Sequence, residues 1–154
     1  MDATRRLILR SAASAGLVAT AVAAGLLKPG PVLAQWPAEA FAAKKFDDAL
    51  AAINARGAFP SRDIEVKAPD IAENGAVVPV EVATRLPDVR RIAFLGEKNV
   101  YPLVAIFDVV DFDGALSTRI KMGQTSDVRV VVWSGERALT ASKTVKVTAG
   151  GCGG

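Results

Sequence analysis

The chain has 154 residues, of which 51% are hydrophobic and 23% charged, a composition that suits one ordinary globular domain. It contains no histidine and a single cysteine, so zinc, copper and haem sites lack their usual ligands. We therefore expect no metal or other cofactor.

The first 34 residues predict an export signal. Arg5 and Arg6 precede an apolar stretch rich in alanine and glycine, residues 12–27, and residues 32–34 end in a small residue that suits signal peptidase. Paired arginines before a mildly hydrophobic run indicate the twin-arginine pathway. A membrane anchor is the alternative, but this stretch is short and weakly apolar for a span. We expect cleavage after Ala34 and a periplasmic protein.

Cleavage would remove the excess positive charge. The formal net charge of the whole chain is +3, but the signal holds four basic residues against one acidic residue, so residues 35–154 carry 15 of each. Binding to nucleic acid requires a clustered basic surface, which is missing here. We expect no nucleic-acid partner, and no membrane contact after signal cleavage.

One helix is predicted at the start of the mature domain, from Trp36-Pro37 to a stop at Gly57. Its polar face is not basic, which favours packing against the chain's own core over a membrane-surface role. The apolar stripe has helical spacing and consists of Ala42, Phe46, Ala49, Leu50 and Ile53.

From Asp63 onward the apolar residues alternate with a period of two, which is typical of half-buried strands. Seven strands are predicted, at residues 64–67, 76–84, 91–96, 103–109, 116–122, 128–133 and 139–147. Turn signals separate them, including Asn74-Gly75, Pro87-Asp88, Asp113-Gly114 and Ser134-Gly135-Glu136.

Seven short strands with no helix between them favour a mainly β fold, an immunoglobulin-like antiparallel β-sandwich preceded by one helix. Pro79 lies inside a predicted strand and indicates a sheet edge or a bulge. The cysteine and tryptophan pairing of antibody domains is missing, so we predict the architecture without antibody ancestry. The sandwich domain would occupy residues 35–148, with no second domain.

A search for catalytic groups in this domain finds none. Asp108, Asp111 and Asp113 could bind a metal or act as an acid and base, but Asp113-Gly114 has ordinary turn chemistry and no glutamate follows at calcium-loop spacing. The hydroxyls of residues 123–126 have no histidine to act as a base, so a polar loop is favoured there.

Cys152 is the candidate functional residue. It is flanked by Gly150, Gly151, Gly153 and Gly154, and we expect residues 149–154 to form a flexible arm. One odd cysteine in an exported chain indicates an intermolecular disulfide or a thiol kept for chemistry, and a frayed tail with an incidental thiol is the alternative. An extended arm from Val147 would reach about 17 Å, enough to enter an active site of a partner.

The arm carries no group that would activate the thiol. The α-carboxylate of Gly154 disfavours the thiolate form of Cys152, and Lys146 is the nearest basic residue in the sequence. We therefore expect the protein itself not to be an enzyme, and the chemistry to be performed by partners that receive the arm.

The sequence resembles the SoxY family, the sulfur carriers of the bacterial sulfur-oxidising (Sox) system. The resemblance covers nearly the whole mature domain. It is carried by residues 68–80 (APDIAENGAVVPV), 117–128 (STRIKMGQTSDV) and 145–148 (VKVT), by the GGCGG ending, and by the twin-arginine signal.

This resemblance implies that thiosulfate is oxidatively coupled to Cys152 and carried as a cysteine S-thiosulfonate. It also implies a heterodimer with a SoxZ-like subunit, which would explain export of an already folded pair. Transient docking is implied to the c-type cytochrome SoxAX, to the hydrolase SoxB, which releases sulfate, and to the sulfane dehydrogenase SoxCD. No other catalytic residue is implied.

Three other classes of protein are alternatives to a SoxY-like carrier. A ubiquitin-like carrier would hold sulfur as a thiocarboxylate on Gly154, but it needs a helix between strands and works in the cytoplasm. A prenylated terminus is excluded, because only two residues follow Cys152. An exported structural sandwich that dimerises through Cys152 is the remaining alternative.

Overall fold

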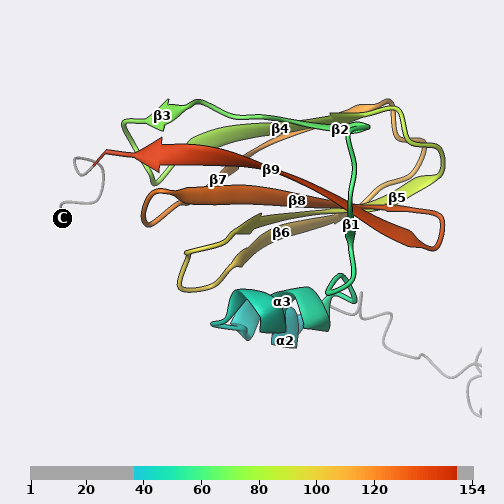
Figure 1. The fold of residues 1–154 in the computed structure, drawn as a ribbon, viewed down its shortest axis with the longest axis horizontal. Helices are drawn as coiled ribbons and strands as arrows, with labels where there is room; N and C mark the ends of the chain where they lie inside the picture. The colour runs from blue at the N-terminus through green and yellow to red at the C-terminus, as the bar shows by residue number, and fades with distance from the viewer. Residues whose placement is uncertain (1–36, 149–154) are drawn as a thin grey trace, which may run out of the picture. The chain divides into compact units, whose positions relative to one another are not determined.

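The computed structural model describes residues 37–148, so the predicted signal peptide (1–34) and arm (149–154) lie outside the described residues. Within the described part, two short helices precede nine strands. Seven of these strands agree with the seven predicted ones to within two residues at each end. Figure 1 shows the helices on one side of the stacked strands.

The single predicted helix is wrong, because the structure has two helices, α2 (Ala38–Ala42) and α3 (Phe46–Ala52). The backbone between them is extended, with ψ angles of 130° at Ala43 and 140° at Lys45. In one straight helix, Ala40 and Ala49 would point in opposite directions, since successive residues are about 100° apart. The break allows both alanines to be buried in one apolar cluster.

The larger sheet has six strands, in the order β1-β9-β8-β5-β6, with β3 also paired to β9. Its strands are β1 (Phe59–Pro60), β3 (Ile71–Ala72), β5 (Val89–Gly96), β6 (Leu103–Asp108), β8 (Ser126–Ser134) and β9 (Arg137–Val147). The smaller sheet has the order β2-β4-β7, with β2 (Ile64–Lys67), β4 (Val78–Thr84) and β7 (Ala115–Ile120).

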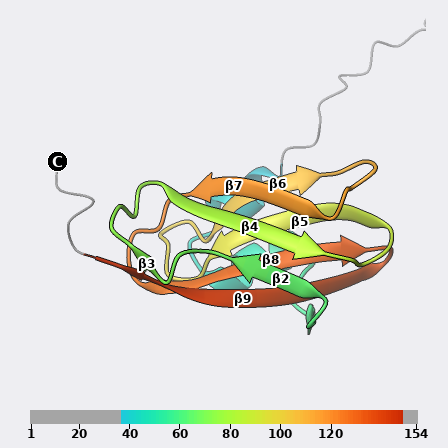
Figure 2. The same ribbon diagram turned by 90° about the horizontal axis from the view of Figure 1, so that it is seen from above.

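The predicted antiparallel sandwich is confirmed, with one addition. The seven predicted strands pair antiparallel, whereas β1 and β3, which were not predicted, each pair parallel with β9. Two residues are too few to show any period in the sequence, so pairing with a distant strand defines these elements. Figure 2 shows β3 alongside the end of β9.

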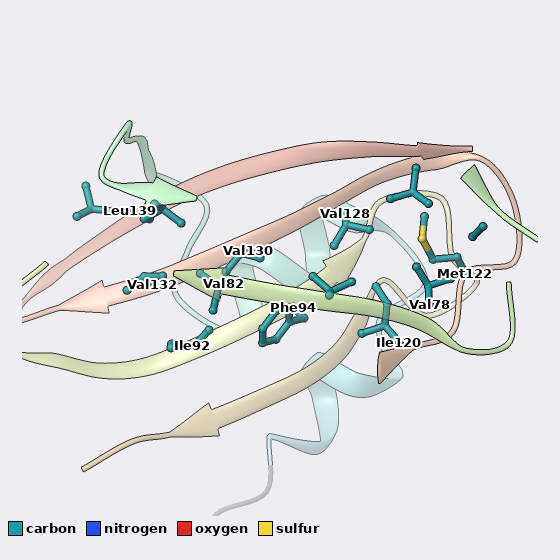
Figure 3. Close-up of a cluster of buried hydrophobic side chains, with 14 of the residues drawn as sticks. Val78, Val82, Ile92, Phe94, Ile120, Met122, Val128, Val130, Val132 and Leu139 are labelled. Carbon is teal, nitrogen blue, oxygen red and sulfur yellow. The ribbon is translucent and has the colours of Figure 1, made fainter. Parts of the chain in front are cut away.

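The core has two apolar clusters, one on each face of the larger sheet. Ile92 and Phe94 of β5 belong to the cluster between the sheets, and the intervening Ala93 belongs to the cluster under the helices. Strand β5 is therefore buried on both faces, as its near-continuous apolar run indicates. Figure 3 shows the cluster between the sheets, including Val78, Ile120, Met122 and Val130.

The predicted turns adopt the backbone conformations that their residues favour. Asp88, Gly114 and Gly135 have positive φ angles of 50°, 101° and 57°. Pro79 pairs with Arg119 of β7, and the ladder between β4 and β2 ends before it, so Pro79 has no strand neighbour on that side. Among residues 37–148, no helix has the length and apolar character needed to span a membrane.

Candidate functional site

Every predicted site residue, Cys152 and the glycines Gly150, Gly151, Gly153 and Gly154, lies outside the described residues. The structure describes the base from which that segment leaves the sandwich. We call residues 146–148, which include the last two residues of β9, the arm root. The end of β9 lies beside β3 at one end of the sandwich (Figure 1).

One side of the arm root is bound by β3. Ile71 pairs with Lys146 and Ala72 with Val147 in parallel register. The Lys146 amide donates to the Asp70 carbonyl at 2.9 Å, and the Thr148 amide donates to the Ala72 carbonyl at 3.1 Å. These bonds extend β9 beyond the end of its ladder with β8.

The other side of the arm root is bound by a side chain. The regular pairing of β8 with β9 ends at Ser126 and Val145. Two residues further along β9, the Val147 amide donates to Thr125 Oγ1 at 2.9 Å, and the same hydroxyl lies 3.4 Å from the Val147 carbonyl oxygen, to which it donates. The Thr125 hydroxyl therefore replaces a strand partner for Val147.

A third segment, the turn before β4, packs against the same place. The Met122 amide donates to the Gly75 carbonyl at 2.7 Å. Asn74 forms the turn, since its Oδ1 accepts a hydrogen bond from the Ala76 amide at 2.9 Å. The Asn74-Gly75 turn predicted from the sequence is therefore confirmed. It lies against the arm root, because a Cβ on Gly75 would come within 2.8 Å of Val147 Cγ1, and the sequence alone did not indicate this contact.

The loop between β5 and β6 joins this end of the sandwich through Asn99. Its Nδ2 donates to the Lys121 carbonyl at 2.7 Å, and its Oδ1 accepts from the Gly123 amide at 3.0 Å. Gln124 Nε2 donates to the Lys98 carbonyl at 3.0 Å. The loop of residues 121–125, which presents Thr125 to β9, is thus held to its neighbour by side-chain amides.

The aspartate cluster considered from the sequence does not form a metal site. Asp108 binds Arg91, with Oδ1 and Nε 2.6 Å apart, and Asp111 has a positive φ of 50°, as turn residues often do. Among the described residues, no three acidic, cysteine or histidine side chains are grouped so that they could hold a metal ion. The polar loop predicted at residues 123–126 is confirmed except that Ser126 begins β8.

An ion pair that shifts the pKa values of both its partners lies on the exposed face of the smaller sheet. Lys67 Nζ lies 2.9 Å from Glu81 Oε1, and Ser117 Oγ donates to Glu81 Oε2 at 3.0 Å. The hydrogen bond and the charge of Lys67 lower the pKa of Glu81, and those of Glu81 raise the pKa of Lys67. These groups line an open hollow of about 870 Å³, but they already satisfy one another.

One known protein family matches this chain over most of its length. Residues 50–152 match the family described as "Sulfur oxidation protein SoxY". The chain belongs to the SoxY family. The match supports a role as a sulfur carrier in sulfur oxidation, and it extends through Cys152.

The solved structure of a SoxY protein agrees with the family assignment. The chain is 42% identical to the sulfur carrier protein SoxY from Chlorobium limicola f thiosulfatophilum, with a TM-score of 0.61, over 73% of this chain and all of that one. A superoxide reductase (neelaredoxin) from Ignicoccus hospitalis is similar at 15% identity and a TM-score of 0.47, over 56% of this chain and 81% of that one. Among curated proteins, the chain has no match.

The three internal stretches on which the SoxY resemblance was based meet at the arm root. Residues 68–80 contain β3 and Gly75, residues 117–128 contain Met122 and Thr125, and residues 145–148 include the arm root itself. Their contacts show that the three stretches, which are far apart in the sequence, are joined at residues 146–148.

Proposed function

We propose that this protein is a periplasmic carrier that holds thiosulfate-derived sulfur covalently on Cys152 and presents it to the enzymes of the Sox pathway. The observation that carries the proposal is the family match, which ends at residue 152 and so includes the single cysteine. The arm root supports it, because Val147 and Thr148 are held by three neighbouring segments immediately before the cysteine-bearing segment.

The proposed loading step is an oxidation. A bond forms between Cys152 Sγ and the terminal sulfur of thiosulfate, the thiol proton is released, and the electron pair passes to the c-type cytochrome SoxAX. The product is a cysteine S-thiosulfonate. Because the electrons leave through the cytochrome, the carrier needs no redox cofactor of its own.

The proposed unloading steps return the thiol to its starting state. Water, activated by the hydrolase SoxB, attacks the sulfonate sulfur and releases sulfate, which leaves a sulfane sulfur on Cys152. SoxCD, as a dehydrogenase, removes six electrons from that sulfur and passes them to its electron acceptor, while three water molecules supply the oxygen of the resulting sulfonate. A second hydrolysis by water then releases sulfate and regenerates the thiol. In this scheme the carrier is not an enzyme, and the GGCGG segment (149–154, with Ala149) acts as the swinging arm.

We further propose that the protein works as a heterodimer with a SoxZ-like subunit and is exported by the twin-arginine pathway after cleavage of residues 1–34. Strand β6 supports such a subunit, because it ends the larger sheet with the apolar sequence LVAIF and only β5 beside it. The side chains of these five residues are buried or half-buried, but the outer backbone edge of β6 has no neighbour among the described strands, and such an edge favours pairing with a strand of another chain.

The competing function is an exported structural sandwich that dimerises through a Cys152 disulfide. Intact-mass measurement of the protein from cells oxidising thiosulfate separates the two. Reducible sulfur or thiosulfonate adducts that map to the C-terminal peptide are expected for the carrier, whereas a disulfide dimer alone is expected for the structural protein. An adduct on Gly154 would instead indicate a thiocarboxylate carrier, although both described helices precede all strands.

The decisive variant is Cys152→Ser, which preserves the size of the side chain and removes the sulfur. Cells that depend on this carrier should lose thiosulfate oxidation. Ser142→Ala is the control, since it makes a change of similar size at an exposed position of β9, outside the C-terminal segment, and leaves the thiol in place. Thiosulfate oxidation at the wild-type rate in Cys152→Ser cells would refute the proposal.

A further inference from the structure

We propose that Thr125 is a positioning residue that fixes the last hydrogen-bonded residues of β9 and therefore the number of residues between the sandwich and Cys152. The effect on the carrier rests on the proposed function, but the geometry rests only on described residues of β3, of β9 and of the loop before β8. The hydroxyl of Thr125 both accepts from the Val147 amide and donates to the Val147 carbonyl.

The Thr125 side chain binds the Val147 amide because no backbone group of β8 pairs with that residue. The last residues paired between β8 and β9 are Ser126 and Val145, so the β8 backbone no longer accompanies β9 at Val147. Successive residues of a strand direct their amides to opposite sides. Lys146 and Thr148 direct theirs to β3, and Val147 directs its own toward Thr125.

The hydrogen bonds on the two sides of the arm root stabilise each other. Strand β3 is only two residues long, and a pair of that length has little stability of its own. With Thr125 in place, the arm root has hydrogen-bond partners on both sides. Without the hydroxyl, β9 would be supported on one side beyond Val145, and its end would open more often.

The number of residues between the sandwich and Cys152 depends on where β9 ends. From Thr148 to Cys152 there are four residues, which reach at most about 14 Å. If β9 opened back to Val145, seven residues would separate Cys152 from the sandwich, and their maximum span would be about 24 Å. The effective concentration of a tethered group falls with roughly the −3/2 power of the tether length, so this change lowers it about twofold.

The test compares Thr125→Val, which keeps the shape and removes the hydroxyl, with Thr125→Ser, which keeps the hydroxyl. Thr144→Val is the matched control, because Thr144 also lies on β9 and binds a side chain of β8, Asp127, but does not touch Val147. Each carrier, isolated with any subunit that copurifies, is loaded with thiosulfate-derived sulfur and given to the hydrolase that releases sulfate.

We expect Thr125→Val to raise the KM of the hydrolase for the carrier about twofold, as the calculated fall in effective concentration requires, and to leave kcat unchanged, because the thiol itself is not altered. Hydrogen exchange of the Val147 amide should be about fivefold faster, as expected for the loss of one hydrogen bond. Thr125→Ser and Thr144→Val should match the wild type in both measurements.

Two results would overturn the inference: wild-type KM in Thr125→Val despite faster exchange of Val147, or an equal rise in KM in Thr144→Val. Either would show that the hydroxyl does not control the reach of the arm. If the carrier function itself were wrong, the wild-type protein would form no adduct on Cys152. The exchange rate of the Val147 amide would still show whether Thr125 holds β9.

Discussion

Gly75 and Val147 lie so close together that a Cβ added to Gly75 would come within 2.8 Å of Val147 Cγ1. The same atom would lie 2.5 Å from the Met122 carbonyl oxygen. Backbone cannot move away as a flexible side chain can, so Gly75 is required by close packing. The turn before β4 thus approaches the arm root only because it lacks a side chain.

Gly75→Ala should therefore destabilise the domain by about 1–3 kcal/mol, the usual cost of overpacking. Urea denaturation measures the change in the free energy of unfolding. Gly57→Ala is the control, since a Cβ at Gly57 meets nothing within 4 Å and should be neutral or stabilise by up to about 1 kcal/mol. Equal stability of the two variants would contradict the close packing at Gly75.

Arg129 joins β8 to the β5–β6 loop and to helix α3. Its Nε and Nη2 lie 2.8 Å and 2.5 Å from Glu97 Oε1, and its guanidinium lies 5.4 Å from the centre of the Phe46 ring. Both groups of the ion pair are less than one-third exposed, at 30% for Arg129 and 26% for Glu97.

We expect Arg129→Ala to lower the free energy of unfolding by about 1–2 kcal/mol, and Arg129→Lys to recover only part of it, because an ammonium lacks the planar stacking geometry. Thermal or urea unfolding provides the measurement. Arg119→Ala is the control on an exposed strand face and should change stability by less than about 0.5 kcal/mol. Full recovery by lysine would argue against the stacking contribution.

Glu81 and Lys67 give the stability of the smaller sheet a defined pH dependence. The pKa of Glu81 is lowered from its usual 4.5, so its stabilising contribution is present above that value and is lost as the pH falls through the lower folded-state pKa. The pKa of Lys67 is raised from 10.5, so its contribution is present below that value and is lost at higher pH.

The difference in melting temperature between the wild type and Glu81→Gln should accordingly be constant between about pH 5 and pH 10 and shrink outside that window. Both side chains are exposed, so we expect a small difference that is further reduced by salt. Melting curves across pH at low and high ionic strength measure it. A difference that persists unchanged at pH 2 would contradict an ionic origin.

The thiol of Cys152 should react as an unactivated thiol. The terminal carboxylate is two residues away in the sequence and the nearest basic residue is Lys146, so no sequence neighbour favours the thiolate. The rate of alkylation by iodoacetamide at neutral pH, compared with that of a synthetic peptide of residues 148–154, measures this. A much faster reaction in the intact protein would show activation by the domain.

The amino-acid sequence by itself determined the class of fold and the candidate attachment residue. The period-two alternation of strands such as β4 and the turn chemistry at Asp113-Gly114 are local properties, so the sandwich was predictable from neighbouring residues. Cys152 stood out because it is the only cysteine and is surrounded by glycine. The break between α2 and α3 was not predictable, because it depends on what both helices pack against.

Only the tertiary structure decided how the base of the C-terminal segment is held. Strand β3 has two residues and acquires its pairing from Lys146 and Val147, far away in the chain. In the sequence Thr125 is an ordinary loop threonine, and only the fold brings Val147 of β9, 22 residues later, within hydrogen-bond distance of it. A hydrogen bond between distant residues has no local period or spacing, so the role of Thr125 follows from the folding of β8 and β9 against each other.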